Sequence, residues 1–168
     1  ESVKIPKETE NIYLNAFRYS NLKKIDFEKN SNLQIIDNFA FDNLQIEEIS
    51  LPDSLTIIGN WAFNHCHLLK KVNINKECRL KTIGKYAFCE TAIQSILFPT
   101  TLTKVDQFAF YKCHMLNSVD NYSNDIKFKE GCFSLSSIEN FKFPQNSVFG
   151  KSSFKHCYKM KKLNFLTE

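Results

Sequence analysis

Cysteine and histidine are the residues of this chain whose types and spacing could support chemistry. They occur side by side as His65-Cys66-His67, Cys113-His114 and His156-Cys157. Thiolate and imidazole groups bind zinc, but a zinc site needs ligands that converge on one tetrahedral point. In each cluster we expect the Cys to point inward and the flanking His to point toward solvent. The pattern favours packing over metal binding, and we predict no metal and no cofactor.

Motifs of catalytic sites are missing from the sequence. It contains no Gly-x-Ser-x-Gly elbow, no phosphate-binding glycine loop and no His-Glu-x-x-His helix. We therefore predict that the chain is not an enzyme, and that a catalytic activity would need a domain outside these residues. Asn121-Tyr122-Ser123 matches a glycosylation acceptor, but one such match is expected by chance in a sequence this rich in Asn and Ser.

Composition and charge exclude further classes. The 168 residues carry a net charge of +4, with both signs mixed along the whole length, which does not make a phosphate-binding stripe. No apolar stretch approaches the roughly 20 residues of a membrane helix, so membrane insertion is not expected. The first residues show no signal peptide. Sixteen Phe in an aromatic share of 14% are the unusual feature.

An internal repeat explains the phenylalanines. A small residue followed by Phe recurs at steps of 24, 22, 25, 22, 23 and 21 residues, and we call this Phe the anchor of each unit. The seven anchors are Phe17, Phe41, Phe63, Phe88, Phe110, Phe133 and Phe154. Because the rings recur in phase, we expect them to stack as a continuous spine inside a solenoid.

Two apolar columns after each anchor indicate a short strand. The first column holds Ile25, Ile49, Val72, Ile96, Val119, Phe141 and Leu163. The second lies two residues further, with Asn121 as its polar exception, and this alternation is typical of a strand with one buried face. We predict a leucine-rich-repeat solenoid over residues 1–168, with about seven repeats of roughly 23 residues. A parallel β-sheet would cover one face and short helical or irregular turns the other.

Proline and glycine recur at fixed places in the unit. Pro52, Pro99 and Pro144 end three strands, where a missing N–H costs least. Gly59, Gly84 and Gly150 stand four residues before an anchor, which predicts a turn with relaxed backbone demands. After Val119 the polar run 120–125 predicts a distorted unit.

These columns resemble the BspA-like class of leucine-rich repeats, whose consensus is roughly Leu-x-x-Ile-x-Ile-Pro, Ser-x-x-x-x-Ile-Gly, Ala-Phe, then Cys and Leu. Residues 49–66 (ISLPDSLTIIGNWAFNHC) and 80–88 (LKTIGKYAF) match it best, and the resemblance covers essentially the whole chain. It implies a surface-exposed or secreted protein of bacteria or parasitic protists that acts in adhesion and host contact.

The repeat also decides how the six cysteines are interpreted. Cys66, Cys113 and Cys157 occupy the same column in alternate units, so stacking separates them by about 10 Å. A disulfide needs Cα atoms within about 7 Å, and we expect mostly free thiols, although the extracellular setting implied by the resemblance favours disulfides. Cys78 and Cys89 lie outside the repeating columns, and we predict them to be the reactive or exposed thiols.

The outward side chains of the strands form the candidate partner-binding surface. They are Lys24, Asp26, Glu48, Ser50, Lys71, Asn73, Ser95, Leu97, Ser118, Asp120, Asn140, Lys142, Lys162 and Asn164. Mixed charge without an aromatic ladder or Arg cluster suits a protein or glycan ligand better than nucleic acid. These positions could equally be solvated strand residues without a partner. The competing function is an intracellular scaffold or recognition module with the same fold.

Neither end of the sequence shows the polar cap that solenoids need. We therefore expect either a segment of a longer array or end-to-end contact between two copies, that is, a homo-oligomer.

Overall fold

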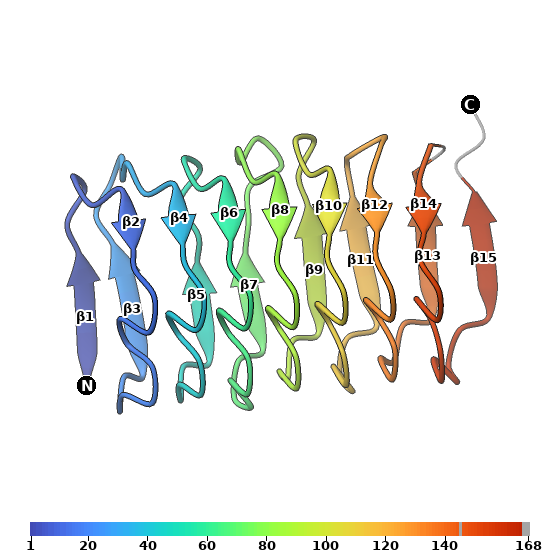
Figure 1. Cartoon of the computed structure of the whole chain (residues 1–168), viewed down its shortest axis with the longest axis horizontal. Coiled ribbons are helices and arrows are strands. Elements are labelled where there is room, and N and C mark those ends of the chain that lie inside the picture. Colours follow the sequence, from blue (N-terminus) through green and yellow to red (C-terminus); the bar gives the residue numbers. More distant parts are fainter. Residues whose placement is uncertain (145, 166–168) are drawn as a thin grey trace.

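The computed structural model describes residues 1–144 and 146–165 and shows a parallel β-solenoid (Figure 1). Each turn contains one longer and one shorter strand, and the first and last strands, β1 and β15, lie at opposite ends of the stack. Within the described residues all regular elements are strands, so no helix is long and apolar enough to cross a membrane. The solenoid prediction is confirmed.

The longer strands follow the two apolar columns of the sequence. They are β1 (Ser2–Ile5), β3 (Lys24–Phe27), β5 (Glu48–Ser50), β7 (Lys71–Asn73), β9 (Ser95–Phe98), β11 (Ser118–Asn121), β13 (Asn140–Phe143) and β15 (Lys162–Phe165). β1 pairs with β3, and the other six form one parallel sheet in the order β15-β13-β11-β9-β7-β5. We call this layer the long-strand face.

The opposite layer is a second parallel sheet, which differs from our expectation of a sheet on one face only. Its seven two-residue strands are β2 (Asn11–Ile12), β4 (Ile35–Ile36), β6 (Ile57–Ile58), β8 (Thr82–Ile83), β10 (Lys104–Val105), β12 (Lys127–Phe128) and β14 (Val148–Phe149). The second residue of each strand is the apolar residue five positions before the anchor. With only one inward residue per strand, the sequence offers no alternation from which to recognise it.

The stacked anchor rings fill the space between the two sheets. Phe88 is fully buried, and its ring lies parallel to those of Phe63 and Phe110, with centroids 5.1 and 5.4 Å away. The small residues before the anchors of the five central units, such as Ala62 and Ala87, are also fully buried. The phenylalanine spine predicted from the repeat is therefore present, and offset stacking adds to the free energy of burial.

The turns that carry the anchors contain no helix. In every unit the residues two before and two after the anchor adopt left-handed φ angles between 54 and 61°. Alternate N–H groups then bond in two directions. Phe88 N–H donates to the Ala109 carbonyl of the next unit at 2.8 Å, whereas Thr91 N–H donates back to the Phe88 carbonyl at 3.3 Å. This satisfied backbone offsets the roughly 1–2 kcal/mol that each left-handed residue costs.

Three repeated glycines have a different role from the one we predicted. Gly59, Gly84 and Gly150 are not among the residues with positive φ, so they are not needed for an unusual turn. Instead, a Cβ at Gly84 would lie 2.6 Å from the carbonyl carbon of Gly59, which is backbone and cannot move aside. Close stacking of consecutive units is what requires glycine here.

Candidate interaction surface on the long-strand face

The outward positions named from the sequence lie together on the long-strand face. Lys24, Glu48, Ser50, Lys71, Ser95, Asp120 and Lys142 are exposed, and Asp26, Asn73, Leu97 and Ser118 are half-buried. The side chains of Asn140, Lys162 and Asn164 lie outside what the structure describes. The parallel register places equivalent residues beside one another, for example Lys71 beside Glu48 and Ser95.

Polar contacts order the middle of this face. Asn73 Nδ2 donates to Glu48 Oε1 at 2.6 Å and to Ser50 Oγ at 3.0 Å, and Lys71 Nζ lies 3.2 Å from Glu48 Oε1. The hydrogen bond from Asn73, followed by that from Lys71, holds the pKa of Glu48 below its usual range. The side chains are thus held in place before any ligand arrives, which lowers the entropy cost of binding.

Pairing along this face alternates between close and open interfaces. β1 with β3 and β9 with β11 are each paired at four positions, and β5 with β7 at three. By contrast, β7 and β9 are paired at one position, β11 and β13 at two, and β3 and β5 share no register pair. The long strands therefore stand in pairs, and we call the three open interfaces between pairs the seams.

Proline explains where the seams lie. In two close interfaces the residue after the second apolar column donates its N–H to the preceding unit: Glu28 to the Ile5 carbonyl and Tyr122 to the Phe98 carbonyl, each at 3.0 Å. At the seams this position is Pro52, Pro99 or Pro144. Proline has no N–H, so the last bond of the ladder cannot form. The prolines do more than end strands at low cost, because each one removes a possible hydrogen bond to the preceding unit at a seam.

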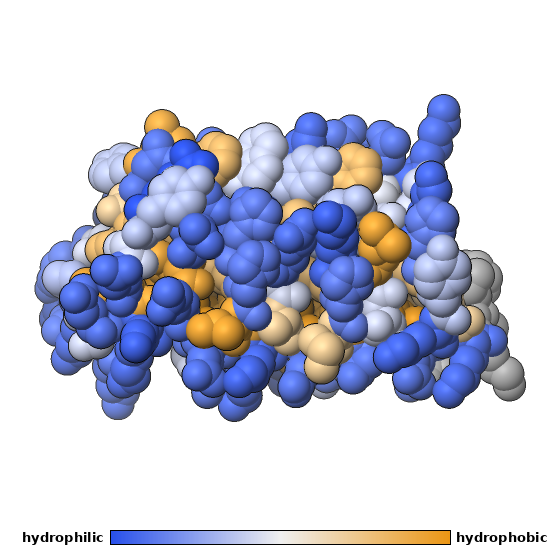
Figure 2. All heavy atoms as spheres, turned by 90° about the horizontal axis from the view of Figure 1, so that it is seen from below, coloured by the Kyte–Doolittle hydropathy of each residue, from blue (hydrophilic) through white to orange (hydrophobic). Residues whose placement is uncertain are grey.

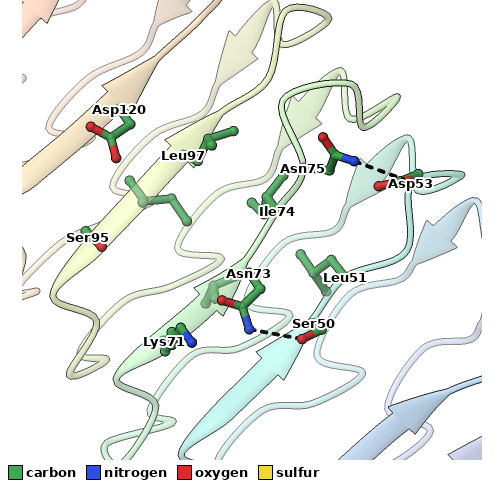
Figure 3. A pocket seen from close by; sticks show the side chains of 12 residues that line it. Ser50, Leu51, Asp53, Lys71, Asn73, Ile74, Asn75, Ser95, Leu97 and Asp120 are labelled. Carbon is green, nitrogen blue, oxygen red and sulfur yellow. Dashed lines mark hydrogen bonds between the residues drawn. The ribbon is translucent and has the colours of Figure 1, made fainter.

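An open groove lies at each seam. The first has a volume of about 520 Å³ and lies between β3 and β5, and the third has about 430 Å³ and lies between β11 and β13. The second, of about 420 Å³, covers β7 and the seam to β9 and also reaches residues of the β5 unit. Figure 3 shows the second groove, with Asn73 and Asn75 on one side and Leu97 and Asp120 on the other. Asp120 also lines the third groove. Sequence reasoning found the rim residues but not the grooves.

Cysteines point inward, as expected, and all six are unpaired. Cys66 and Cys113 are fully buried, and burial raises the pKa of each thiol to about 12. Cys78 and Cys89 are also buried, so the prediction that they are the exposed thiols is wrong. Cys78 belongs to the hydrophobic core, Cys89 follows the anchor Phe88 on the turn edge, and burial raises the pKa of both thiols. Cys157 is the partly exposed one.

Histidines point outward around Glu90 on the turn edge. Lys112 Nζ lies 2.9 Å from Glu90 Oε1, and His65 Nε2 lies 3.8 Å from Glu90 Oε2. The hydrogen bond from Lys112 is the largest cause that lowers the pKa of Glu90. Within the residues that the structure describes, no group of three His, Cys, Asp or Glu side chains is arranged to hold a metal ion. The cluster is an ion-pair network centred on the half-buried Glu90.

A second row of aromatic rings lies on the turn edge and was missed from the sequence. Phe39, Trp61, Tyr86 and Phe108 stand two residues before their anchors, and Phe39 and Trp61 stack at 5.0 Å and 2°. The Arg18 guanidinium covers the free face of Phe39 at 4.5 Å. Because neighbours cover the ring faces, these rings stabilise the edge and do not offer stacking to a base. Figure 2 shows this edge, where hydrophilic residues cover most of the surface.

Comparison with known proteins agrees with this architecture. Residues 1–80 and 73–168 match the model of the BspA type leucine rich repeat region, with six copies of the repeat. No curated protein sequence matches the chain. A leucine-rich repeat protein from Bacteroides ovatus shares 21% identity at a TM-score of 0.70, over 98% of this chain and 50% of that one.

A second solved structure is equally similar. The pneumococcal vaccine antigen PcpA shares 23% identity at a TM-score of 0.71, over 97% of this chain and 50% of that chain. At such identities the likeness concerns the fold alone. The chain spans half the length of both solved proteins.

Proposed function

This chain belongs to the BspA-type leucine-rich repeat family, and we propose that it is a non-catalytic interaction module that mediates adhesion or host contact at a cell surface. The long-strand face is the surface that binds the partner, a protein or glycan. The family supports the interaction role. The observation that carries the choice of surface is the set of three grooves, which open on this face at the seams.

Repeat architecture supports the same choice. Solenoids bind partners along extended surfaces on which equivalent residues recur from one unit to the next. One of the solved relatives is a pneumococcal vaccine antigen, which favours display at a surface for this chain too.

We propose that residues 1–168 act as one domain. The alternative function is an intracellular scaffold with the same face, and a leader or anchor in the full-length gene would decide between them.

Binding to intact cells tests the proposal. Purified, fluorescently labelled protein is incubated with human epithelial cells, and bound label is measured by flow cytometry. We expect saturable binding that Lys71→Glu with Lys142→Glu reduces at least about fivefold, because both lysines stand on groove rims.

The matched control is Lys81→Glu with Lys127→Glu, which makes the same charge change at exposed lysines of the short-strand layer. It should bind like the unmodified protein. Equal loss with both pairs would assign binding to net charge instead of to the face, and absence of any saturable binding would contradict the adhesion role.

A further inference from the structure

We propose that the three seam grooves are successive subsites for one linear, neutral, hydroxyl-rich polysaccharide that lies across the long strands. This inference rests on the proposed function and names the ligand class of the same surface. Three observations carry it: the spacing of the grooves, the side chains around them, and their balance of charge.

The grooves recur every second unit along the solenoid. The short strands form one continuous sheet in which neighbours lie about 4.8 Å apart, so two units, and with them successive grooves, are separated by about 10 Å or slightly more on the opened face. Only a ligand whose own groups repeat at that distance can occupy all three in the same way. This is the length of a disaccharide in an extended polysaccharide, so alternate sugars would fill successive grooves.

Peptides fit this spacing less well. In an extended peptide about 10 Å corresponds to three residues, and successive grooves would meet side chains from opposite faces of the strand. A polyproline helix repeats every three residues, about 9 Å, but it docks into aromatic-lined grooves. The second groove has no aromatic lining and Phe27 is the single aromatic residue that lines the first, whereas Tyr122 and Phe141 line the third, so the three grooves do not repeat an aromatic lining.

Side chains around the grooves suit hydroxyl groups. The second groove presents the Asn73 Oδ1, the Asn75 amide and the carboxylates of Asp53 and Asp120 to the hydroxyls of a ligand (Figure 3). Both N–H groups of the Asn73 amide are already bonded to Glu48 and Ser50, so Asn75 is the amide donor and the other groups accept. Half-buried Leu97 adds an apolar surface for the C–H groups of a sugar ring.

Charge within the grooves excludes polyanions. The second groove holds Lys71 with two carboxylates, and the third holds Lys142 with Asp120. Because neither has an excess of positive charge, sulfated or nucleic-acid polymers would gain little attraction and lose hydration. A neutral polymer meets no such cost.

Isothermal titration with purified neutral oligosaccharides tests the proposal. The probes are β-1,4-linked glucose, mannose and xylose series and a β-1,3-linked glucose series, each at lengths that span one, two or three grooves. For at least one series we expect affinity to rise at least about tenfold from the one-groove to the three-groove length, because linked subsites act together. Flat affinity with length, or no binding of any series, would overturn it.

Asp120→Ala provides the sharper measurement, because this residue lines two of the three grooves. It should remove most of the gain with length and leave the weak affinity of the shortest oligomer within about threefold. Glu130→Ala is the matched control, an exposed acidic residue outside the grooves, and it should titrate like the unmodified protein. Equal effects of the two substitutions would also overturn the assignment.

The cell-binding experiment distinguishes failure of the polysaccharide proposal from failure of the proposed interaction function. If no oligosaccharide series binds while the long-strand face still governs cell binding, the ligand class is wrong and the interaction role stands. Loss of that cell binding after protease treatment of the cells would then assign the grooves to a protein partner. Absence of both kinds of binding contradicts the proposed function itself.

Discussion

Replacing Phe88 with Ala tests how far the phenylalanine spine determines stability. The side chain is fully buried and stacks on Phe63 and Phe110 with nearly parallel rings. Removing a buried Phe costs about 3–5 kcal/mol, and the two lost stacking contacts place the expected value in the upper half of that range. For a chain of this size, about 4 kcal/mol corresponds to a fall in Tm of roughly 8–16 °C.

Urea titration followed by circular dichroism measures this free energy, with Phe17→Ala as the matched control. Phe17 is an anchor of the same type, but it is half-buried at the start of the row, where it stacks on Phe41 at 5.6 Å. We expect its replacement to cost about 1–2 kcal/mol, since less apolar area returns to water. A cost below about 1 kcal/mol for Phe88→Ala, or equal costs at the two positions, would refute the spine as the main source of stability.

Three further perturbations follow from the described contacts. Pro99→Ala restores an N–H at the position equivalent to Tyr122, whose N–H bonds to the preceding unit, so hydrogen exchange should find a protected amide at position 99. A freely exchanging amide would contradict the explanation of the seams. Burial raises the pKa of the Cys113 thiol to about 12, so a thiol-specific disulfide reagent should modify this residue only after unfolding. Rapid modification of the folded protein would show that the core around Cys113 opens to solvent. Glu90 has a lowered pKa, so its contribution to the free energy of unfolding should be present above the ordinary carboxyl range and disappear as the pH falls through the lowered value. Lys112→Ala should raise the pKa of Glu90 in an NMR titration. An unchanged titration would show that the ion pair does not cause the shift.

Much of the fold could be predicted because each unit repeats the same inward residues. The anchor column identifies the buried side of each turn, and the two alternating apolar columns identify the buried side of each long strand. The second sheet could not be recognised, since its strands contain two residues and too few positions to show a period of two. The turns were also mispredicted in part, because left-handed backbone at Trp61 or Tyr86 contradicts local propensity and is stabilised by hydrogen bonds to neighbouring units.

The candidate surface shows a similar division. Alternation along the strands identified the outward positions, but nothing in a single unit reveals how closely two units pair. The signal that could have located the seams was the recurrence of Pro52, Pro99 and Pro144 in every second unit. Cys78 and Cys89 were misassigned because a residue outside a repeating column can still be buried by a loop.

Alternating pairing also limits how such a chain can change in length. The smallest segment that can be inserted or deleted without changing the proline pattern and the spacing of the seams is two turns. Two turns contain about 46 residues, as the steps from Pro52 to Pro99 and from Pro99 to Pro144 show. Duplication or deletion of a single turn would place two open or two closed interfaces side by side. Insertions and deletions that preserve the surface should therefore come in even numbers of turns, and an engineered array should be lengthened the same way.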